Sequence, residues 1–197
     1  MRFDIITIFP EAFTSYLNAS ILKRAREKRL IDIRIHNLRD FASGKHKLVD
    51  APPYGGGPGM AFKIEPLVKA LGSILRIKNN ELRIKRKALV ILFSAAGKQF
   101  NAQTARDFAK KYNRIVMIAG HYEGVDERIK SIIRNSGFII QEVSIGPYVL
   151  TGGELPAMIV IDAVARHIPG VLGKAESLEE LRYGVGVPAY TRPEVFT

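Results

Sequence analysis

Residues 144–168, SIGPYVLTGGELPAMIVIDAVARHI, join a polar loop to a long apolar segment. The loop carries three glycines, which permit sharp turns and close approach of a ligand to the backbone: Gly146, Gly152 and Gly153. Thr151 and Glu154 flank the expected helix start, and Pro156 occupies its first turn. Apolar residues then recur with helical period: Met158, Ile159, Ile161, Val164 and Ala165. The stretch predicts a loop entering a helix N-terminus, which suits a polar or carboxylate-bearing ligand. A strand-to-helix turn without a ligand is the alternative.

Strand and helix patterns alternate along the rest of the chain. Apolar or alternating runs predict strands at residues 3–9, 31–36, 88–93, 114–119 and 138–143. Amphipathic patterns predict further helices at residues 10–28, 63–75, 101–112 and 125–135. This alternation predicts an α/β fold with a mainly parallel sheet flanked by helices. Three loops that follow strands would then form one pocket at the carboxyl edge of the sheet: residues 94–98, 120–126 and 144–153.

Composition narrows the class of protein. The 197 residues carry a formal net charge of +11, which favours nucleic acid or an anionic surface as partner; the alternative is a charge that only maintains solubility. The chain has no cysteine, which excludes disulfides and thiolate metal sites and fits a reducing cytoplasm. No apolar run is long enough for a membrane span, and the first residues do not resemble a signal peptide.

Several common ligand motifs are absent from the sequence. No G-x-G-x-x-G follows a predicted strand, and SAAGKQ at residues 94–99 lacks the first Gly and the Ser or Thr of a P-loop, so ATP and NAD are disfavoured. The histidines have no metal-ligand spacing and are interpreted as surface or hydrogen-bonded residues: His36, His46, His121 and His167. YGGGPGM at residues 54–60 is either a site of close backbone approach or a linker. The basic residues 76–87 are interpreted as an exposed connection.

Five segments, in order, resemble the bacterial tRNA (guanine-N(1))-methyltransferases of the TrmD family, in the SPOUT class. They are FDIITIFPEAF, HKLVDAPPYGGGPGM, AGHYEGVDERI, SIGPYVLTGGELPAMIVIDAVARHIPGVLG and PAYTRPEVF. The resemblance implies a trefoil-knotted α/β fold and methylation, by S-adenosylmethionine (AdoMet), of N1 of the guanosine 3′ of the tRNA anticodon. It implies these cofactor contacts: Phe93, Ser94, Gly120, Tyr122, Ile145, Gly146, Tyr148, Leu150, Gly152, Gly153 and Pro156.

The resemblance also implies catalytic residues. Arg166 matches the family's catalytic arginine, although a helix pair with Asp162 is the structural alternative. Glu123 matches the glutamate that contacts the target guanine. The family places an Asp as general base after the arginine helix, but residues 175–188 contain none. Glu180, with Glu179 as the alternative, is the nearest carboxylate.

Two cofactor loops depart from the family pattern. Residues 146–148 read Gly-Pro-Tyr where the family has G-D-Y, and residues 94–97 read Ser-Ala-Ala-Gly where it has S-P-x-G. Residues 1–172 are expected to form the methyltransferase domain, and residues 173–197 a linker and active-site loop. The family's C-terminal tRNA-gripping domain does not follow, which predicts a truncated chain or a naturally short member.

The resemblance further implies a cytoplasmic homodimer whose active sites are shared between subunits, acting on the tRNA anticodon arm. Magnesium is compatible with the family, but no ligand cluster in the sequence specifies it. Two other functions stay open at this point. One is an AdoMet- or RNA-binding homologue with weak or lost activity, and the other is a SPOUT methyltransferase for another RNA nucleotide.

Overall fold

Five parallel strands form the central sheet of the computed structural model, in the order β2-β1-β6-β5-β7. The structure describes residues 1–75, 88–173, 178, 188–193 and 195. The strands span Arg2–Thr7 (β1), Asp32–Asn37 (β2), Ala88–Gln99 (β5), Arg114–Ile118 (β6) and Ile139–Ser144 (β7). All five correspond to strands predicted from the sequence, and the predicted parallel arrangement is confirmed.

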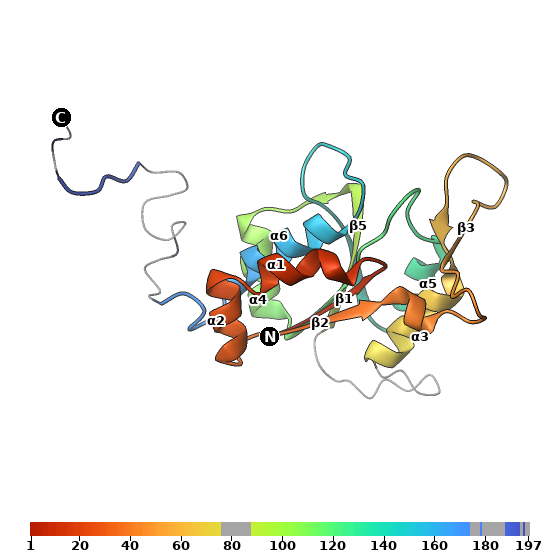
Figure 1. Cartoon of the computed structure of the whole chain (residues 1–197), viewed down its shortest axis with the longest axis horizontal. Helices are drawn as coiled ribbons and strands as arrows, with labels where there is room; N and C mark the ends of the chain where they lie inside the picture. Colours follow the sequence, from red (N-terminus) through yellow and green to blue (C-terminus); the bar gives the residue numbers. More distant parts are fainter. Residues whose placement is uncertain (76–87, 174–177, 179–187, 194, 196–197) are drawn as a thin grey trace.

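Helices cover both faces of this sheet (Figure 1). One face carries η1 (Pro10–Phe13), α1 (Thr14–Leu17), α2 (Ser20–Glu27), α4 (Ala102–Lys111) and α6 (Glu154–Ala165). The other carries η2 (Leu38–Phe41), α3 (Ile64–Leu75) and α5 (Arg128–Asn135). The fold therefore has three layers, with the sheet buried between two sets of helices.

Alternate residues of each central strand supply the two cores. In β5, Leu89 and Ile91 pack on the α4 and α6 side, while Val90 and Leu92 pack on the α3 and α5 side. Successive strand side chains point to opposite faces, so a strand covered on both faces is apolar throughout. This accounts for the near-continuous apolar run that begins at residue 88.

The predicted helix over residues 10–28 is interrupted. Asn18 ends α1, its side-chain amide donating to the carbonyl oxygen of Thr14. Ala19 is extended, and Ser20, the first residue of α2, has a φ of 44°. The break lets Leu17 and Leu22, on separate helices, bury their side chains in the same core.

The first predicted pocket loop, residues 94–98, lies inside β5 rather than after it. Phe93 and Lys98 both align with Val143 of β7, so the intervening residues bulge out of the ladder. Gly97 lies across that bulge, where a Cβ would stand 2.7 Å from the Val143 nitrogen. The bulge carries Ser94 outward while the strand continues.

The glycine-rich residues 54–60 connect two short antiparallel strands, β3 (Asp50–Ala51) and β4 (Ala61–Phe62), which the sequence did not predict. Residues 76–87, interpreted as an exposed connection, lie outside the described residues. In the part of the chain that is described, no helix has the length and apolar character needed to cross a membrane.

Candidate active site

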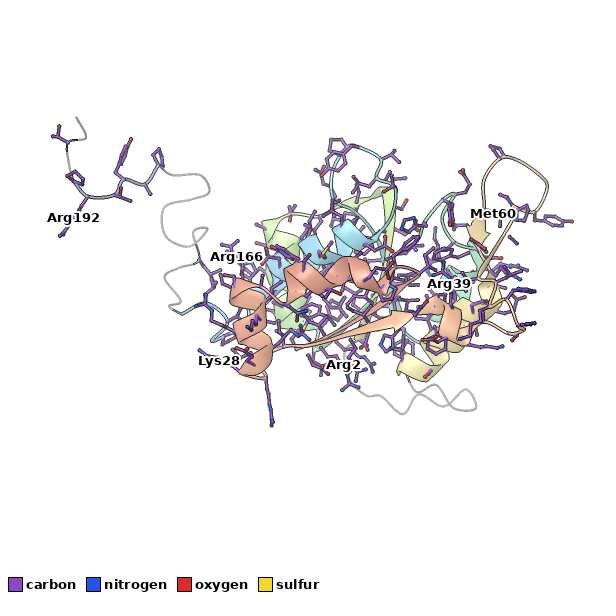
Figure 2. All side chains as sticks on the ribbon, in the orientation of Figure 1. Arg2, Lys28, Arg39, Met60, Arg166 and Arg192 are labelled. Carbon is purple, nitrogen blue, oxygen red and sulfur yellow. The ribbon has the colours of Figure 1, made fainter. Side chains whose placement is uncertain are left out.

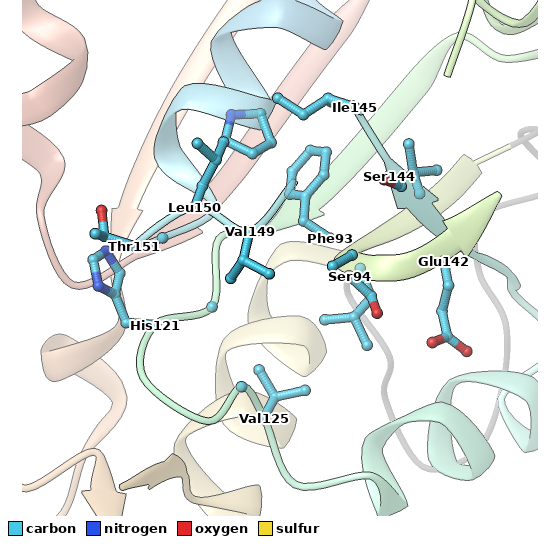
Figure 3. A pocket seen from close by; sticks show the side chains of 18 of the residues that line it. Phe93, Ser94, His121, Val125, Glu142, Ser144, Ile145, Val149, Leu150 and Thr151 are labelled. Atoms are coloured by element: carbon cyan, nitrogen blue, oxygen red, sulfur yellow. The ribbon is translucent and has the colours of Figure 1, made fainter. Parts of the chain in front are cut away.

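A cavity of about 270 Å³ lies at the carboxyl ends of β5, β6 and β7. Its walls come from all three predicted loops: the β5 bulge, the turn after β6 and the loop between β7 and α6. Ligands of open parallel sheets bind at this edge. Figure 3 shows Phe93 and Ser94 beside Val149, with His121 and Thr151 on one side of the cavity and Glu142 on the other. The prediction that these loops build one pocket is confirmed.

Ten of the eleven residues that the resemblance assigned to the cofactor line this cavity. They are Phe93, Ser94, Gly120, Tyr122, Ile145, Tyr148, Leu150, Gly152, Gly153 and Pro156. The cavity thus combines apolar side chains with glycine backbone, a lining that suits a ligand having both a ring and polar ends.

Gly146 does not line the cavity but lies behind Tyr148. A Cβ on Gly146 would overlap the Tyr148 ring, so glycine is required for the ring to lie there. The Ser144 hydroxyl donates to the Gly146 carbonyl at 2.9 Å, and the Tyr148 hydroxyl donates to the Ile145 carbonyl at 3.3 Å. These two hydrogen bonds hold the short loop between Ser144 and Tyr148.

Glu123 lies on the turn after β6, exposed at the edge of the cavity. Its backbone nitrogen donates to the Met60 carbonyl at 3.0 Å, and the next residue, Gly124, donates to the His121 carbonyl at 2.9 Å. Tyr122, between them, has a φ of 55°, which is uncommon for a tyrosine. The turn is therefore tightly folded and joined to the end of the glycine-rich loop.

Two other cavity carboxylates share one lysine as their ion-pair partner. Lys130 Nζ contacts Glu127 Oε2 at 2.5 Å and Glu142 Oε2 at 2.9 Å. Burial alone would lower the pKa of Lys130, but the hydrogen bonds to Glu127 and Glu142 outweigh it and raise that pKa. In the described part of the chain, the Glu123 carboxylate forms no ion pair. Among the described residues, Glu123 is therefore the exposed cavity carboxylate that has no ion-pair partner.

A buried network beneath the cavity was missed by the sequence analysis. Thr7 Oγ1 donates to Glu154 Oε1 at 2.5 Å, and His121 Nε2 lies 2.7 Å from Glu154 Oε2. Glu154 is 8% exposed and Thr7 is fully buried. The sequence offered one indication of this network, which is that Glu154 is a charged residue at the start of the mainly apolar helix α6. His121 is therefore hydrogen-bonded to Glu154. His36 likewise contacts Asp4 at 2.8 Å, so the interpretation of these two histidines as hydrogen-bonded residues is confirmed.

The exposed side of α6 forms a second pocket, and Arg166 lies there. Its lining comes from η1, α1 and α6: Ala12, Ser15, Tyr16, Leu155, Met158, Ile159, Asp162, Ala163 and Arg166. Ile159, which belongs to the predicted apolar stripe, is 37% exposed and lies on the outer side of the helix, whereas Met158 is partly buried against the core and also borders this pocket. Its buried face is formed by Ala157, Val160, Ile161, Val164 and Ala165.

Arg166 and Glu123 are not brought together within one chain. Among the residues that the structure describes, none lines both pockets. Twelve residues separate Arg166 from Glu154, roughly 18 Å along a helix. Figure 2 shows Arg166 and Met60, which contacts the Glu123 turn, toward opposite ends of the molecule. Asp162 accepts a 2.6 Å hydrogen bond from the Tyr16 hydroxyl, which connects α1 to the same side of α6.

Glu180 and its alternative, Glu179, lie outside the described residues. Among the residues that are described, no group of three or more His, Cys, Asp or Glu side chains is arranged to hold a metal ion. The cavity itself is lined by ring-bearing side chains and glycine backbone, a composition that suits an organic ligand.

Comparison with known proteins identifies the family. The family model described as tRNA (Guanine-1)-methyltransferase TrmD matches residues 1–197. The chain belongs to the TrmD family. A tRNA (guanine-N(1)-)-methyltransferase of Dictyoglomus turgidum is 48% identical over 199 aligned residues, which cover 100% of this chain and 75% of that protein. Enzymes of the same name from Dehalococcoides mccartyi, at 48%, and Moorella thermoacetica, at 46%, show the same coverage.

The match to the TrmD family includes the residues that form the cavity. The identity extends over the whole chain, so the strand-end loops, the Glu123 turn and α6 all lie within the aligned region. The resemblance found in five sequence segments is thereby confirmed at the level of the family.

Proposed function

We propose that this protein methylates N1 of a guanosine in tRNA, the one 3′ of the anticodon, with AdoMet as the methyl donor. The observation that carries the proposal is the single cavity built from three strand-end loops in a chain of the TrmD family. Relatives at 46–48% identity bear the name of this activity. The formal net charge of +11 supports a substrate with a phosphate backbone.

The cofactor-binding part of the proposal rests on the lining of the cavity. Phe93, Ile145 and Leu150 supply apolar surface for an adenine ring, and Gly152 and Gly153 allow backbone to approach polar ends of the molecule. Gly146 acts by admitting the Tyr148 ring rather than by lining the cavity. When bound, AdoMet supplies an electrophilic methyl group; the protein's residues bind it and present the guanine.

The chemistry on guanine requires removal of the N1 proton and stabilisation of charge on the neighbouring carbonyl oxygen. We assign Glu180 as the base that accepts the proton, Arg166 as the group that stabilises the charge and Glu123 as a contact to the guanine. The unpaired Glu123 carboxylate at the cavity edge supports its role as an acceptor for guanine N–H groups. Extrusion of the guanosine from its stack would bring the base to this edge.

The separation of Arg166 and Glu123 supports a homodimer. The two residues line different pockets, and in the proposed dimer a second copy brings its Arg166 to this cavity. The outer side of α6 supports such a contact, since Leu155 is 51% exposed and Ile159 is 37% exposed there, beside Tyr16 at 46%. The second copy is the proposed occupant of that surface.

The remaining features of the proposal come from the family. The chain would be knotted as in SPOUT enzymes, with residues 1–172 as the methyltransferase domain and residues 173–197 as the segment carrying Glu180. A tRNA substrate implies a cytoplasmic location. A magnesium requirement has no support from the described side chains.

Calorimetric titration with AdoMet, followed by transfer of labelled methyl groups to a tRNA transcript, tests the function. We expect binding with one site per chain and transfer that depends on the guanosine 3′ of the anticodon. Binding without transfer would contradict the catalytic assignment, and the absence of binding would contradict the cofactor site.

A further inference from the structure

A buried carboxylate connects the loops on either side of the cavity. Glu154 is the first residue of α6, directly after the loop assigned to the cofactor. Its two oxygens contact the Thr7 hydroxyl at 2.5 Å and His121 Nε2 at 2.7 Å. One side chain thereby joins the end of β1, the turn that carries Glu123 and the start of α6.

The backbone around Glu154 admits this contact only because it is glycine. A Cβ on Gly152 would overlap the His121 ring and stand 2.6 Å from Glu154 Oε2. Gly152 also forms an isolated antiparallel bridge with His121, and the nitrogen of the next residue, Gly153, donates to the Gly120 carbonyl at 2.9 Å. The Glu154 side chain and the backbone contacts of Gly152 and Gly153 therefore connect the same two loops, the turn after β6 and the loop before α6. Figure 3 shows His121 and Thr151 of these loops close together.

Hydrogen bonds to both of its oxygens offset the free-energy cost of burying the Glu154 carboxylate. A buried carboxylate costs free energy unless its oxygens accept hydrogen bonds, and both Glu154 oxygens have partners. The N-terminus of α6 adds a favourable dipole for the negative charge. Thr7 is oriented for its part, because its oxygen accepts from the Phe9 nitrogen at 2.9 Å while its hydroxyl proton faces Glu154.

Neither Glu154 nor Thr7 lines the cavity, whereas His121, Tyr122 and Glu123 do. Any effect of the buried pair on a ligand is therefore indirect, and the contact of Glu154 with His121 transmits it to the turn. His121 is further held by an edge contact with the Phe9 ring, at 4.9 Å between centroids.

We infer that Glu154 is a positioning residue that, with Thr7, holds His121 and thereby fixes the Glu123 turn against the cofactor loop. The inference rests on the proposed function, because it assigns Glu123 to the guanine. Loss of Glu154 would loosen the turn and weaken the use of tRNA more than the binding of AdoMet.

The test compares Glu154→Ala and Glu154→Gln with Glu27→Ala, which removes an exposed carboxylate at the end of α2. We expect E154A to lower kcat/KM for tRNA by at least about tenfold, because a displaced contact residue misplaces the base. The AdoMet Kd should stay within about threefold of the wild-type value. E154Q should recover most of the loss, since an amide can accept from Thr7 and donate to a neutral His121. E27A should match wild type.

Thr7→Val provides a second variant, should E154A fold poorly. It removes the donor to Glu154 at a residue outside the cavity and should lower kcat/KM for tRNA by about threefold, while Thr7→Ser should restore it. Wild-type kcat/KM in both E154A and T7V would overturn the inference. Equal losses of AdoMet and tRNA binding would also overturn it, because they would indicate a purely structural role.

Amide hydrogen exchange separates this inference from the proposed function, because it needs no activity. In E154A, the amides of Glu123 and Gly124, which donate to Met60 and His121, should exchange faster, with β1 and β6 unchanged. Unchanged exchange in the turn, or equal loss of protection in the sheet, would contradict the positioning role. A wild-type protein without methyl transfer would instead contradict the proposed function.

Discussion

Gly59 lies directly against the side chain of Glu123: a Cβ on Gly59 would stand 2.5 Å from Glu123 Oε1 and 2.7 Å from its Cγ. The contact joins the glycine-rich loop to the turn at the edge of the cavity. The neighbouring Met60 carbonyl accepts a 3.0 Å hydrogen bond from the Glu123 nitrogen. The sequence left open whether this loop provides close backbone approach or a linker, and at Gly59 it provides close approach.

Replacement of Gly59 should therefore disturb Glu123. Gly59→Ala places a methyl group where the carboxylate lies, at a φ of 83° that alanine tolerates poorly. We expect kcat/KM for tRNA to fall by about tenfold through displacement of Glu123, with AdoMet affinity retained. Gly55→Ala is the matched control, since its φ is 88° but a Cβ there meets nothing within 4 Å. Equal kinetics for G59A and G55A would contradict a role for the contact.

Replacement of Gly153 should affect the cofactor site instead. A Cβ on Gly153 would stand 2.6 Å from Ala119 Cα and 3.0 Å from the Gly120 nitrogen, which are backbone atoms that cannot move aside cheaply. Gly153→Ala should lower the free energy of unfolding by about 2 kcal/mol and weaken AdoMet binding in calorimetry. Unchanged AdoMet affinity would show that the junction between β6 and α6 is not part of the site.

Gly72, unlike Gly59 and Gly153, has room for a side chain. It lies within α3, has no positive φ, and a Cβ there meets nothing within 4 Å. Gly72→Ala should raise the free energy of unfolding by about 0.5–1 kcal/mol, because alanine loses less backbone entropy in a helix. Thermal unfolding measures the change, and a lower melting temperature would contradict the helical environment.

Asp4 should control stability at low pH. Its fully buried carboxylate contacts His36 at 2.8 Å, Arg2 at 2.7 Å and Arg114 at 2.8 Å. Burial would raise the pKa of Asp4, but the hydrogen bonds from His36, Arg2 and Arg114 together hold that pKa well below its ordinary value of 3.8. The folded state thus binds fewer protons than the unfolded state. The stabilisation is complete above about pH 4 and is lost as the pH falls further.

Asp4→Asn should lower the free energy of unfolding at pH 7 by about 3 kcal/mol, because it leaves the partly buried guanidinium groups of Arg2 and Arg114 without their carboxylate partner. Denaturant unfolding between pH 7 and pH 2 should also show a shallower decline for D4N than for wild type. Asp107→Asn, at an exposed ion pair with Lys111, should leave the stability nearly unchanged. Parallel pH profiles for wild type and D4N would contradict the assignment.

Mixed dimers test the proposal that Arg166 and Glu123 act from different subunits. Arg166→Ala and Glu123→Ala proteins should each be inactive. After mixing and subunit exchange, heterodimers contain one site with both wild-type residues. About a quarter of all sites should then be active if exchange is random. A mixture no more active than either variant would contradict the shared site.

The layers of the fold were predictable because a sheet buried on both faces leaves a clear apolar pattern. Residues 88–93 are an example, since both β5 faces are covered by helices. The bulge that follows was not predictable, because it depends on Phe93 and Lys98 sharing one partner across the sheet, Val143. The β3–β4 pair has two residues per strand, too few for a sequence pattern.

The parts of the candidate site that come from continuous loops were predictable from the sequence. Contacts between residues that are far apart in the sequence were not. The cavity loops were found because strand ends of a parallel sheet meet at one edge. Thr7 and Glu154 are 147 positions apart, and no spacing rule connects them. The outward position of Ile159 was not predictable, because helical period identifies a stripe but not the side that the sheet covers.

Nucleoside analysis of a tRNA treated with this protein and AdoMet tests the central claim most directly. Two transcripts would be compared, with guanosine or adenosine at the position 3′ of the anticodon. The proposed function predicts N1-methylguanosine in the digest of the first transcript and no methylated nucleoside in the second. Methylation of another nucleotide, or of neither transcript by a protein that binds AdoMet, would contradict it.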